Sequence, residues 1–372
     1  MRHVLDTTGS REGLASALTE CLDAYMPAGL LILAGGSNGF TPETIDPILR
    51  EIPVPVVGGI FPAIIHGKEL LQKGTLVIAL PRRPRVQVLR SLSQRVKDVE
   101  TVLDDMLLGE HGHTMFVLVD GLALEVGPLL SSLFSVFGLE VNYLGGGAGA
   151  LRAESTPCLI TNEGLIRDAA VLAVTDLHSG VGICHGMESV SGPHWVTEVH
   201  GTRIGSLDWQ PARARFQELI HAVDPSLQAN EGFPISDEFC LAVNRIGGEK
   251  VIRDPYKADP DGSLHVIVGL SEGGTVDLVR ATPDSTIRAA AQALEFARSS
   301  YRGPNRYASV LCFDCFGRWQ FLRERFIEEL DALQDDHCEL LGALTIGGEV
   351  ANCGRDFLDY YNRTCVVGVL ED

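Results

Sequence analysis

Residues 310–370 decide the fold of this chain. They run VLCFDC (310–315), FGR (316–318), a segment of helical periodicity (319–333), CELLGALTI (338–346), GGE (347–349) and finally YYNRTCVVGVL (360–370). An apolar run, an amphipathic segment and a second apolar run together predict a β-α-β unit. Because polar residues follow these runs, we expect side chains from several elements to converge on one pocket at the strand ends. The residues concerned are Cys315, Arg318, Glu349, Asn362 and Thr364.

Two earlier parts of the chain have the same design. LILAGGS (31–37) leads through residues 41–51 to PVVGGIF (55–61), and MFVLVD (115–120) leads through residues 126–137 to VNYLGGGAG (141–149). In each unit glycines lie at or near the end of the second apolar run. The spacing between units is irregular, so the sequence predicts three variations on a β-α-β theme and not a solenoid.

Composition limits the classes of partner. The chain has 372 residues, 30 Lys and Arg against 49 Asp and Glu, and a net charge of −19. This field repels phosphate backbones and anionic lipid surfaces, so we expect neither a nucleic acid nor a membrane partner. No apolar run approaches the roughly 20 residues that span a bilayer, the N-terminus has no secretory pattern, and most of the nine cysteines lie in apolar runs. The sequence therefore predicts a cytoplasmic protein with reduced thiols.

The length favours two domains. After residue 149 the pattern changes to short strands separated by turns, and a helix is expected after residue 207. We place the boundary near residue 200, with one domain at 1–200 and the other at 201–372. Later strands are separated by a polar loop, DPYKADPDGS (254–263). Both domains are expected to be α+β, with mixed or antiparallel sheets flanked by helices.

Local signals mark two helix starts. Thr41 is followed by Pro42, and Thr282 is followed by Pro283. Threonine is a favoured N-cap and proline suits the first helical position. The sequence predicts helices from these two points.

The segment from Cys312 to Arg318 offers two kinds of chemistry. On a strand Cys312 and Cys315 point to opposite faces, so Cys312 is predicted to be a core thiol. Arg318 near a helix start suits a carboxylate or another planar anion, or it is a structural residue that caps a neighbouring strand or pairs with Glu349. A nucleophilic Cys315 needs a base, and no histidine is close in sequence. We therefore favour a binding protein over an enzyme.

Three other features are candidates for ligand contact. Asp120 ends the strand MFVLVD, where a second set of ligand contacts is expected. The glycine-rich run 145–149 lacks the P-loop spacing and indicates a tight bend or a close backbone approach to a ligand. His185 lies in the apolar run GVGICHG and is a candidate axial haem ligand or a core histidine. His111 and His113 form an H-x-H pair that predicts a polar loop in preference to a metal site.

The chain resembles FIST-domain proteins over nearly its whole length. The resemblance rests on VPVVGGIFPAIIHG (54–67), LVDGL (118–122) with NYLGGGAG (142–149), and HWVTEVHGTRIGSLDWQPARARF (194–216). In the C-terminal half it rests on C-x-x-R from Cys315 to Arg318, on Gly348-Glu349, and on N-x-T from Asn362 to Thr364. Residues 58–65 depart from the family, because apolar residues replace a more polar stretch.

The resemblance implies a sensory module that binds a small molecule and passes the event to a signalling protein. A histidine kinase, a chemoreceptor or a cyclic-dinucleotide enzyme would be a suitable partner. It implies ligand contacts at Cys315, Arg318, Gly348, Glu349, Asn362 and Thr364. Three alternatives stay open at this point: a haem-binding nitric-oxide sensor, a cysteine-dependent enzyme, and a scaffold that uses apolar residues 60–65 as an interface.

Overall fold

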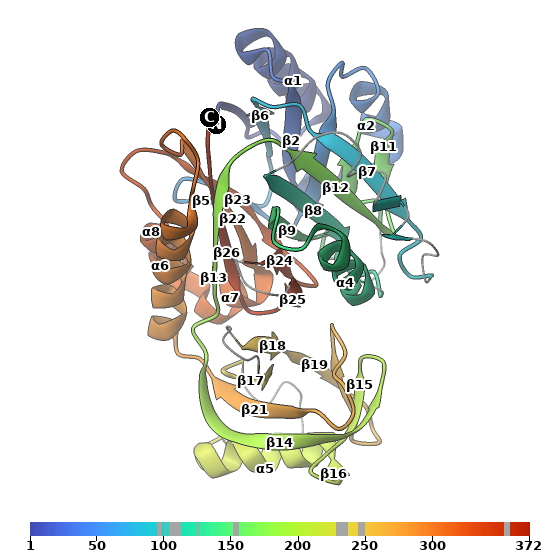
Figure 1. Ribbon diagram of the computed structural model, residues 1–372, viewed down its shortest axis with the longest axis vertical. Helices are drawn as coiled ribbons and strands as arrows, with labels where there is room; N and C mark the ends of the chain where they lie inside the picture. The colour runs from blue at the N-terminus through green and yellow to red at the C-terminus, as the bar shows by residue number, and fades with distance from the viewer. Residues whose placement is uncertain are drawn as a thin grey trace.

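The computed structural model describes residues 1–94, 99–100, 102–103, 113–124, 126–151, 156–227, 237–244, 250–352 and 358–372. Figure 1 shows a larger part that contains both chain ends and a smaller part below it. We call them the main body and the small body. The main body holds three six-stranded sheets, and the small body holds one eight-stranded sheet.

The first repeat of the main body begins with the chain. Its elements are β1 (His3–Asp6), α1 (Arg11–Tyr25), β2 (Gly29–Gly35), η1 (Gly36–Asn38), α2 (Pro42–Leu49), β3 (Val56–Phe61), β4 (Ile64–His66), β5 (Glu69–Leu71) and β6 (Thr75–Leu80). The predicted cap of α2 is confirmed, because Thr41 is the N-cap, Pro42 follows it, and Thr44 completes a capping box with Thr41.

The second repeat follows directly with the same order of strands. Its elements are β7 (Arg85–Arg90), β8 (Thr114–Asp120), α4 (Val126–Phe137), β9 (Asn142–Ala148), β10 (Leu159–Thr161), β11 (Gly164–Ile166) and β12 (Ala169–Thr175). Residues 99–100 and 102–103, between β7 and β8, are helical. They occupy the position of α1 in the first repeat.

The third repeat is interrupted by the small body. Its elements are β13 (Ser179–Cys184), α6 (Pro283–Ser300), β22 (Ser309–Cys315), α7 (Phe316–Leu322), η2 (Arg323–Arg325), α8 (Phe326–Ala332), β23 (Leu340–Thr345), β24 (Glu349–Ala351), β25 (Asp359–Tyr361) and β26 (Cys365–Leu370). The predicted start of α6 is confirmed, since the Thr282 side chain accepts a hydrogen bond from the N–H of Ser285.

The small body is inserted between β13 and α6. Its elements are β14 (Glu188–His200), β15 (Arg203–Leu207), β16 (Gln210–Pro211), α5 (Ala212–Val223), β17 (Phe239–Val243), β18 (Val251–Arg253), β19 (Pro255–Ala258), β20 (Leu264–Val266) and β21 (Thr275–Arg280). The chain thus crosses between the bodies twice, at residues 185–187 and 281–282.

The three main-body sheets have the same topology. Their strand orders are β1-β6-β2-β3-β10-β11, β7-β12-β8-β9-β24-β25 and β13-β26-β22-β23-β4-β5. One parallel pair lies inside each sheet, namely β2 with β3, β8 with β9, and β22 with β23. These pairs are the three predicted β-α-β units, which are confirmed.

Each repeat gives its hairpin to another repeat. The β4–β5 hairpin extends the sheet of the third repeat, β10–β11 extends that of the first, and β24–β25 extends that of the second. The exchange is cyclic, so the three repeats close around a common centre. The exchange also pairs one edge strand of every β-α-β unit with a strand from another repeat. Fewer strand edges are therefore left unpaired.

Glycines and backbone hydrogen bonds hold the repeats together at this centre. Gly149 donates to the carbonyl of Ile60 at 2.7 Å, Ile346 donates to that of Gly147 at 3.0 Å, and Leu344 donates to that of Ala63 at 2.9 Å. A Cβ atom on Gly147 would lie 1.8 Å from the carbonyl oxygen of Ile346. The glycine thus lets two protein backbones approach closely, and the predicted approach to a ligand stays a prediction.

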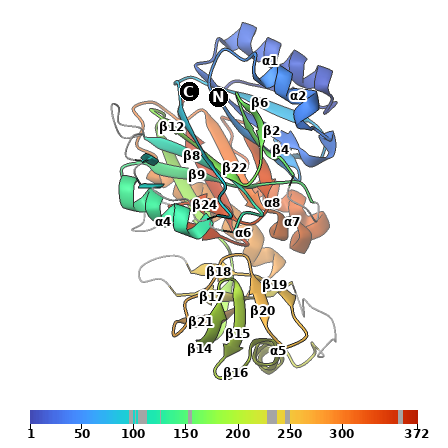
Figure 2. The same cartoon turned by 90° about the vertical axis from the view of Figure 1, so that its right-hand side faces the viewer.

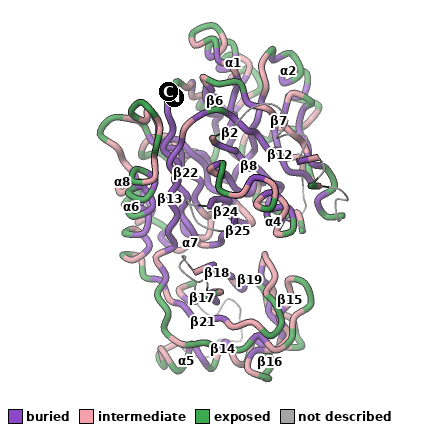
Figure 3. The backbone as a smooth tube through the Cα atoms, in the orientation of Figure 1, coloured by how far each residue is buried: buried purple, intermediate pink, exposed green. Residues whose placement is uncertain are grey.

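Each sheet has an inner and an outer face. Phe116 and Leu118 of β8 belong to a central core shared with the other two sheets, whereas Met115, Val117 and Val119 pack with α4. This follows from the alternation of side chains along a strand. Figures 1 and 2 show the helices outside the sheets, and Figure 3 shows the buried strands of the main body.

The predicted fold class is confirmed: the structure is α+β, with mixed sheets flanked by helices. The predicted boundary at residue 200 coincides with the turn between β14 and β15 in the small body, while strands of both sequence halves share the main-body sheets. As a division of the sequence it stays a prediction. Within the described residues, no helix has the length and hydropathy required to cross a bilayer.

The proposed apolar interface at residues 60–65 is wrong, because this segment is not surface. Ile60, Phe61, Ala63, Ile64 and Ile65 are all buried, and Ile64 and Ile65 pair with β23. Apolar residues replace polar ones here because the segment forms part of the core.

Candidate functional site

Arg318 lies at the start of α7 and is 1% exposed. Its Nε donates to Glu329 at 2.9 Å and pairs with Asp314 at 3.1 Å. Its Nη2 donates to the Thr286 carbonyl at 2.8 Å and also to Glu329, and its Nη1 donates to the carbonyls of His185 at 3.1 Å and Arg363 at 3.3 Å. All three nitrogens are therefore occupied by protein atoms, and the partners are Asp314 and Glu329. The expected pairing with Glu349 is wrong.

The partners of Arg318 are themselves fully buried. Burial, as the largest cause, raises the pKa of Asp314 well above its ordinary value and also raises that of Glu329, whereas Arg318 acts to lower both. One oxygen of each carboxyl group, Oδ2 of Asp314 and Oε2 of Glu329, has no hydrogen-bond partner. The positive charge of Arg318 thus acts on three acidic groups, namely Asp314, Glu329 and Glu349. Such an arrangement favours a neutral form of at least one of them.

Glu349 begins β24 and is 0% exposed. Its Oε1 accepts a hydrogen bond from Thr345 at 2.5 Å, and its Oε2 has no partner of good geometry. Burial raises its pKa to about 8, although Thr345, Cys315, Arg318 and the Thr364 N–H act in the opposite direction. At neutral pH this carboxyl group is therefore mostly protonated.

Gly348, Asn362 and Thr364 complete the predicted group. Each makes a hydrogen bond with a backbone atom of another residue. Asn362 Nδ2 donates to the carbonyl of Gly347 at 2.8 Å, and Thr364 Oγ1 donates to that of Asn362 at 2.7 Å. Gly348 accepts from the N–H of Gly147 at 2.8 Å, and a Cβ atom on it would lie 2.5 Å from the Tyr361 carbonyl. The structure brings these residues together with Glu349 as a buried support. Direct ligand contact by any of them stays a prediction.

Asp120 lies at the end of β8, in the same sheet as β24. Its Oδ2 accepts the N–H of Asp168 at 2.7 Å, and its Oδ1 accepts that of Leu122 at 3.1 Å. The side chain is 2% exposed and organises the turn before α4. A ligand contact here also stays a prediction.

Cys315 is partly exposed at the N-cap of α7. Burial of the thiol, and then the charge of Glu349, raise its pKa well above the ordinary value, although Arg363 and the N–H groups of Gly317 and Arg363 act to lower it. A thiol in this state is mostly protonated and is a weak nucleophile at neutral pH. Cys312 is fully buried, with its sulfur 3.7 Å from that of Cys365.

His185 does not fit as an axial haem ligand. Its Nδ1 accepts the N–H of Met187 at 2.8 Å, and the residue is 5% exposed. A neutral imidazole that accepts at Nδ1 carries its proton on Nε2. The Nε2 lone pair that iron requires is then absent. Of the H-x-H pair, His111 lies outside the described residues, and His113 stacks on His178 with ring centres 4.1 Å apart.

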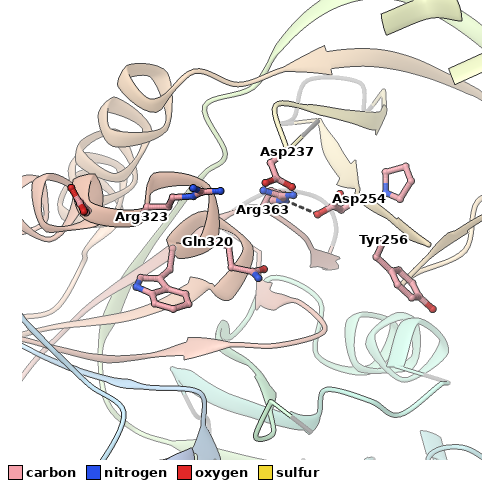
Figure 4. Close-up of a pocket in the computed structure, with 9 residues that line it drawn as sticks. Asp237, Asp254, Tyr256, Gln320, Arg323 and Arg363 are labelled. Carbon is pink, nitrogen blue, oxygen red and sulfur yellow. Dashed lines mark hydrogen bonds and ion pairs between the residues drawn. The ribbon is translucent and has the colours of Figure 1, made fainter. Parts of the chain in front are cut away.

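A cleft of about 750 Å³ lies between α7 and the small body. Its volume is in the range of small-molecule sites. The lining residues are Asp237, Asp254, Pro255, Tyr256, Trp319, Gln320, Arg323, Glu324 and Arg363. Figure 4 shows Gln320 and Arg323 on the α7 side, Asp254 and Tyr256 on the small body, and Arg363 between the two sides.

The two arginines of the cleft are held in an uncommon backbone conformation. Arg323 has φ 51° and Arg363 has φ 53°, and both values are rare for residues other than glycine. Arg363 Nε donates to Asp254 at 2.5 Å, and its Nη1 donates to the Gly317 carbonyl at 3.1 Å. Residues held in this way are concentrated at functional sites.

Sequence reasoning missed these cleft residues. Arg363 is the middle residue of the N-x-T motif, of which only the two ends were predicted to bind. Trp319 and Gln320 directly follow the C-x-x-R motif. The predicted polar loop at 254–263 was wrong in part, since Pro255–Ala258 forms β19, and Asp254 and Tyr256 line the cleft. The motifs mark the right region, but their intervening and following residues face the cavity.

Comparisons with known families agree with the expected resemblance. Residues 29–210 match the family model for the FIST N domain, and residues 212–352 match that for the FIST C domain. Together the two matches cover most of the chain. No curated protein matches it significantly.

Proposed function

Because this chain belongs to the FIST-domain family, which is associated with sensing and with small-ligand binding, we propose that it is a cytoplasmic sensory protein. Its ligand is a small molecule bound in the cleft between the two bodies, and its output is contact with a separately encoded signalling protein. A histidine kinase, a chemoreceptor or a cyclic-dinucleotide enzyme would suit that role. The observation that carries the proposal is the cleft lined by Arg363 and residues of both bodies.

The chemistry of the cleft favours a ligand with an anionic group and an apolar or planar part. Arg323 and Arg363 offer guanidinium groups, which bind carboxylates in a two-point geometry. Tyr256 and Trp319 offer flat apolar surface. The acidic residues Asp237 and Glu324 would accommodate an ammonium group on the same molecule. An amino acid or a related carboxylate has these features.

The position of the cleft suggests how binding is passed on. Asp254 belongs to the small body, and Arg363 lies in the β25–β26 turn of the main body. A ligand anion on Arg363 competes with Asp254 and so changes how the bodies contact each other. A ligand changes an equilibrium only by its differential affinity for the two states, and this competition would provide one.

Binding is favoured over catalysis by the state of the thiol at the site. Cys315 is the nearest candidate nucleophile, and its raised pKa keeps it protonated. Its acidic neighbour Glu349 is also held mostly in the neutral form. An activated nucleophile needs a lowered pKa or an adjacent general base, and the surroundings of Cys315 act against both.

Thermal shift with a panel of amino acids and small carboxylates tests the proposal. A true ligand at 100 times its dissociation constant should stabilise the protein by about 2.7 kcal/mol. We expect Arg323→Ala to abolish that shift. The matched control is Arg325→Ala, since Arg325 lies two residues away but pairs with Glu328 and Asp284 outside the cleft.

The result that overturns the proposal is equally specific. If every shift persists in both Arg323→Ala and Trp319→Ala, the ligand does not occupy this cleft. If no small carboxylate or amino acid shifts the wild type, the proposed ligand class is wrong.

A further inference from the structure

Three potential metal ligands meet on the main body away from the cleft. They are His3 on β1, His66 on β4, and Glu339 just before β23. The two imidazole Nε2 atoms are 3.2 Å apart, and each is 3.3 Å from an oxygen of Glu339. The side chains of His3, His66 and Glu339 are 18%, 21% and 46% exposed, so solvent reaches the group.

The three contacts of this triangle cannot all be hydrogen bonds at the same time. An imidazole nitrogen carries either one hydrogen or one lone pair. If both nitrogens donate to Glu339, two N–H groups lie side by side with their nitrogens 3.2 Å apart, and neither can accept from the other. If one nitrogen donates to the other, it has no second hydrogen for the carboxylate.

The other ring nitrogen of His3 makes the conflict sharper. His3 Nδ1 lies 3.5 Å from the carbonyl oxygen of Met1, toward which it can only donate. A neutral His3 in that tautomer presents a lone pair at Nε2. The Nε2 lone pair of His3 then faces both His66 and a carboxylate.

A divalent cation in the middle removes the conflict. We propose that His3, His66 and Glu339 bind one zinc-like transition-metal ion. Tetrahedral zinc with bonds of roughly 2.0–2.1 Å separates its ligand atoms by about 3.3 Å, which is the separation found here. Two histidines and one glutamate are a known zinc ligand set, and a water molecule would take the fourth position. A His3 Nδ1–H pointing at a carbonyl is the usual outer partner of a metal-bound histidine.

The other cluster of this kind among the described residues is a weaker candidate. Cys312, Asp314 and Cys365 also come close together, but they are fully buried and Asp314 is paired with Arg318. A guanidinium that already binds the carboxylate opposes a second cation there.

The site would act as a brace between repeats. β1 belongs to the sheet of the first repeat, whereas β4 and β23 lie in the sheet of the third. His66 is on the hairpin that the first repeat gives to the third, opposite Leu341 in the register. A bound metal would therefore fasten the first strand of the chain to an exchanged hairpin. None of the three ligands lines the cleft, so this inference does not depend on the proposed function.

The experiment is a titration of the chelator-treated, reduced full-length protein with Zn²⁺, and in parallel with Co²⁺. We expect one equivalent to bind tightly. The Co²⁺ form should show the visible bands of tetrahedral nitrogen and oxygen coordination and no thiolate charge-transfer band. A charge-transfer band would place the metal on cysteines and overturn the assignment.

Three conservative variants identify the ligands: His3→Gln, His66→Gln and Glu339→Gln. Each should weaken binding by more than the roughly 10–100-fold that loss of an outer partner costs. The matched control is the double variant His113→Gln with His178→Gln, a stacked pair near Asp176, and it should bind like the wild type. Glu339 is largely exposed, so Glu339→Gln keeps the test valid if a histidine variant fails to fold. Unchanged binding in Glu339→Gln and His66→Gln, or no stoichiometric binding in the wild type, would mean a hydrogen-bonded triad only.

Discussion

At the scale of single residues, the most specific feature is a guanidinium that has no contact with water. Arg318 joins the segment after β13, α6, α8 and the β25–β26 turn through its hydrogen bonds, because its partners come from all four regions. Removing one partner of a buried ion pair leaves an uncompensated charge. Arg318 therefore holds these four regions together, and its contact with a ligand stays a prediction.

The first prediction concerns this support. Arg318→Ala should lower the free energy of unfolding by about 3–5 kcal/mol, because it strands the carboxylate of Glu329 and frees two buried carbonyls. Urea unfolding followed by circular dichroism measures the loss. Arg325→Ala, at an exposed arginine of the same segment, should leave the midpoint nearly unchanged. A loss in Arg318→Ala no larger than in the control would contradict the structural role.

The second prediction uses the raised pKa of Glu349. The folded protein keeps this proton up to a pKa of about 8, whereas the unfolded chain releases it near 4.5. Between these pH values the folded state holds more protons, so the contribution to stability decreases as pH rises, by up to about 1.4 kcal/mol per pH unit. Below and above this window the contribution is constant.

Glu349→Gln removes the titrating group and keeps the shape. We expect the difference in unfolding free energy between Glu349→Gln and the wild type to grow in favour of the variant from pH 5 to pH 8. Denaturant unfolding at a series of pH values gives the comparison. Parallel pH profiles for the two proteins would show that Glu349 does not titrate in this window.

At the scale of elements, the exchanged hairpins depend on glycines that let backbones approach closely. Gly147 is the sharpest case, since a Cβ atom would meet the Ile346 carbonyl, the Tyr360 hydroxyl and Gly121. Neither the carbonyl nor Gly121 can withdraw without moving a strand end. Even a methyl side chain at position 147 is therefore excluded.

The third prediction follows from this crowding. Gly147→Ala should destabilise the protein by roughly 1–3 kcal/mol or more, as overpacking of a filled interior does. The control is Gly127→Ala in α4, where the nearest atom would be 3.9 Å away. That variant should be unchanged or slightly more stable, because alanine favours helix. Differential scanning calorimetry measures both, and equal stability of the two variants would refute the crowding argument.

Local patterns were enough to predict these elements. They were not enough to predict which distant strands pair with one another. The helix starts at Thr41 and Thr282 and the three parallel pairs follow from capping residues and apolar runs that are contiguous in sequence. The hairpin exchange pairs β4 with β23, almost 280 residues later, through strands of three and six residues. Segments this short have no period that specifies a partner.

The contrast between local patterns and long-range contacts also explains which parts of the site could be predicted. Cys315, Glu349 and Thr364 were expected to meet, and Cys315 and Thr364 both act on the pKa of Glu349. The cleft could not be predicted, because it forms only where residues 254–256 of the small body face α7 and Arg363. Which side of a motif faces a cavity depends on that docking and not on the motif.

At the scale of the whole molecule, two ion pairs of opposite sense join the bodies. Arg253 of the small body pairs with Asp359 at 3.1 Å, and Asp254 pairs with Arg363 at 2.5 Å. The covalent links are the two short crossings at residues 185–187 and 281–282. Figure 2 shows the small body set below the main body from a second direction. A ligand that binds between them is thus placed to change their contact, as in hinge-type closure.

Hydrogen–deuterium exchange with and without a small carboxylate ligand tests this account most directly. If the ligand binds between the bodies, protection should increase together in Pro255–Ala258 of the small body and in Phe316–Leu322 of the main body, with little change in α1 or α4. Loss of both effects in Arg323→Ala, but not in Arg325→Ala, would complete the predicted result. Protection confined to one body, or located away from the cleft, would contradict the claim that the ligand joins the two.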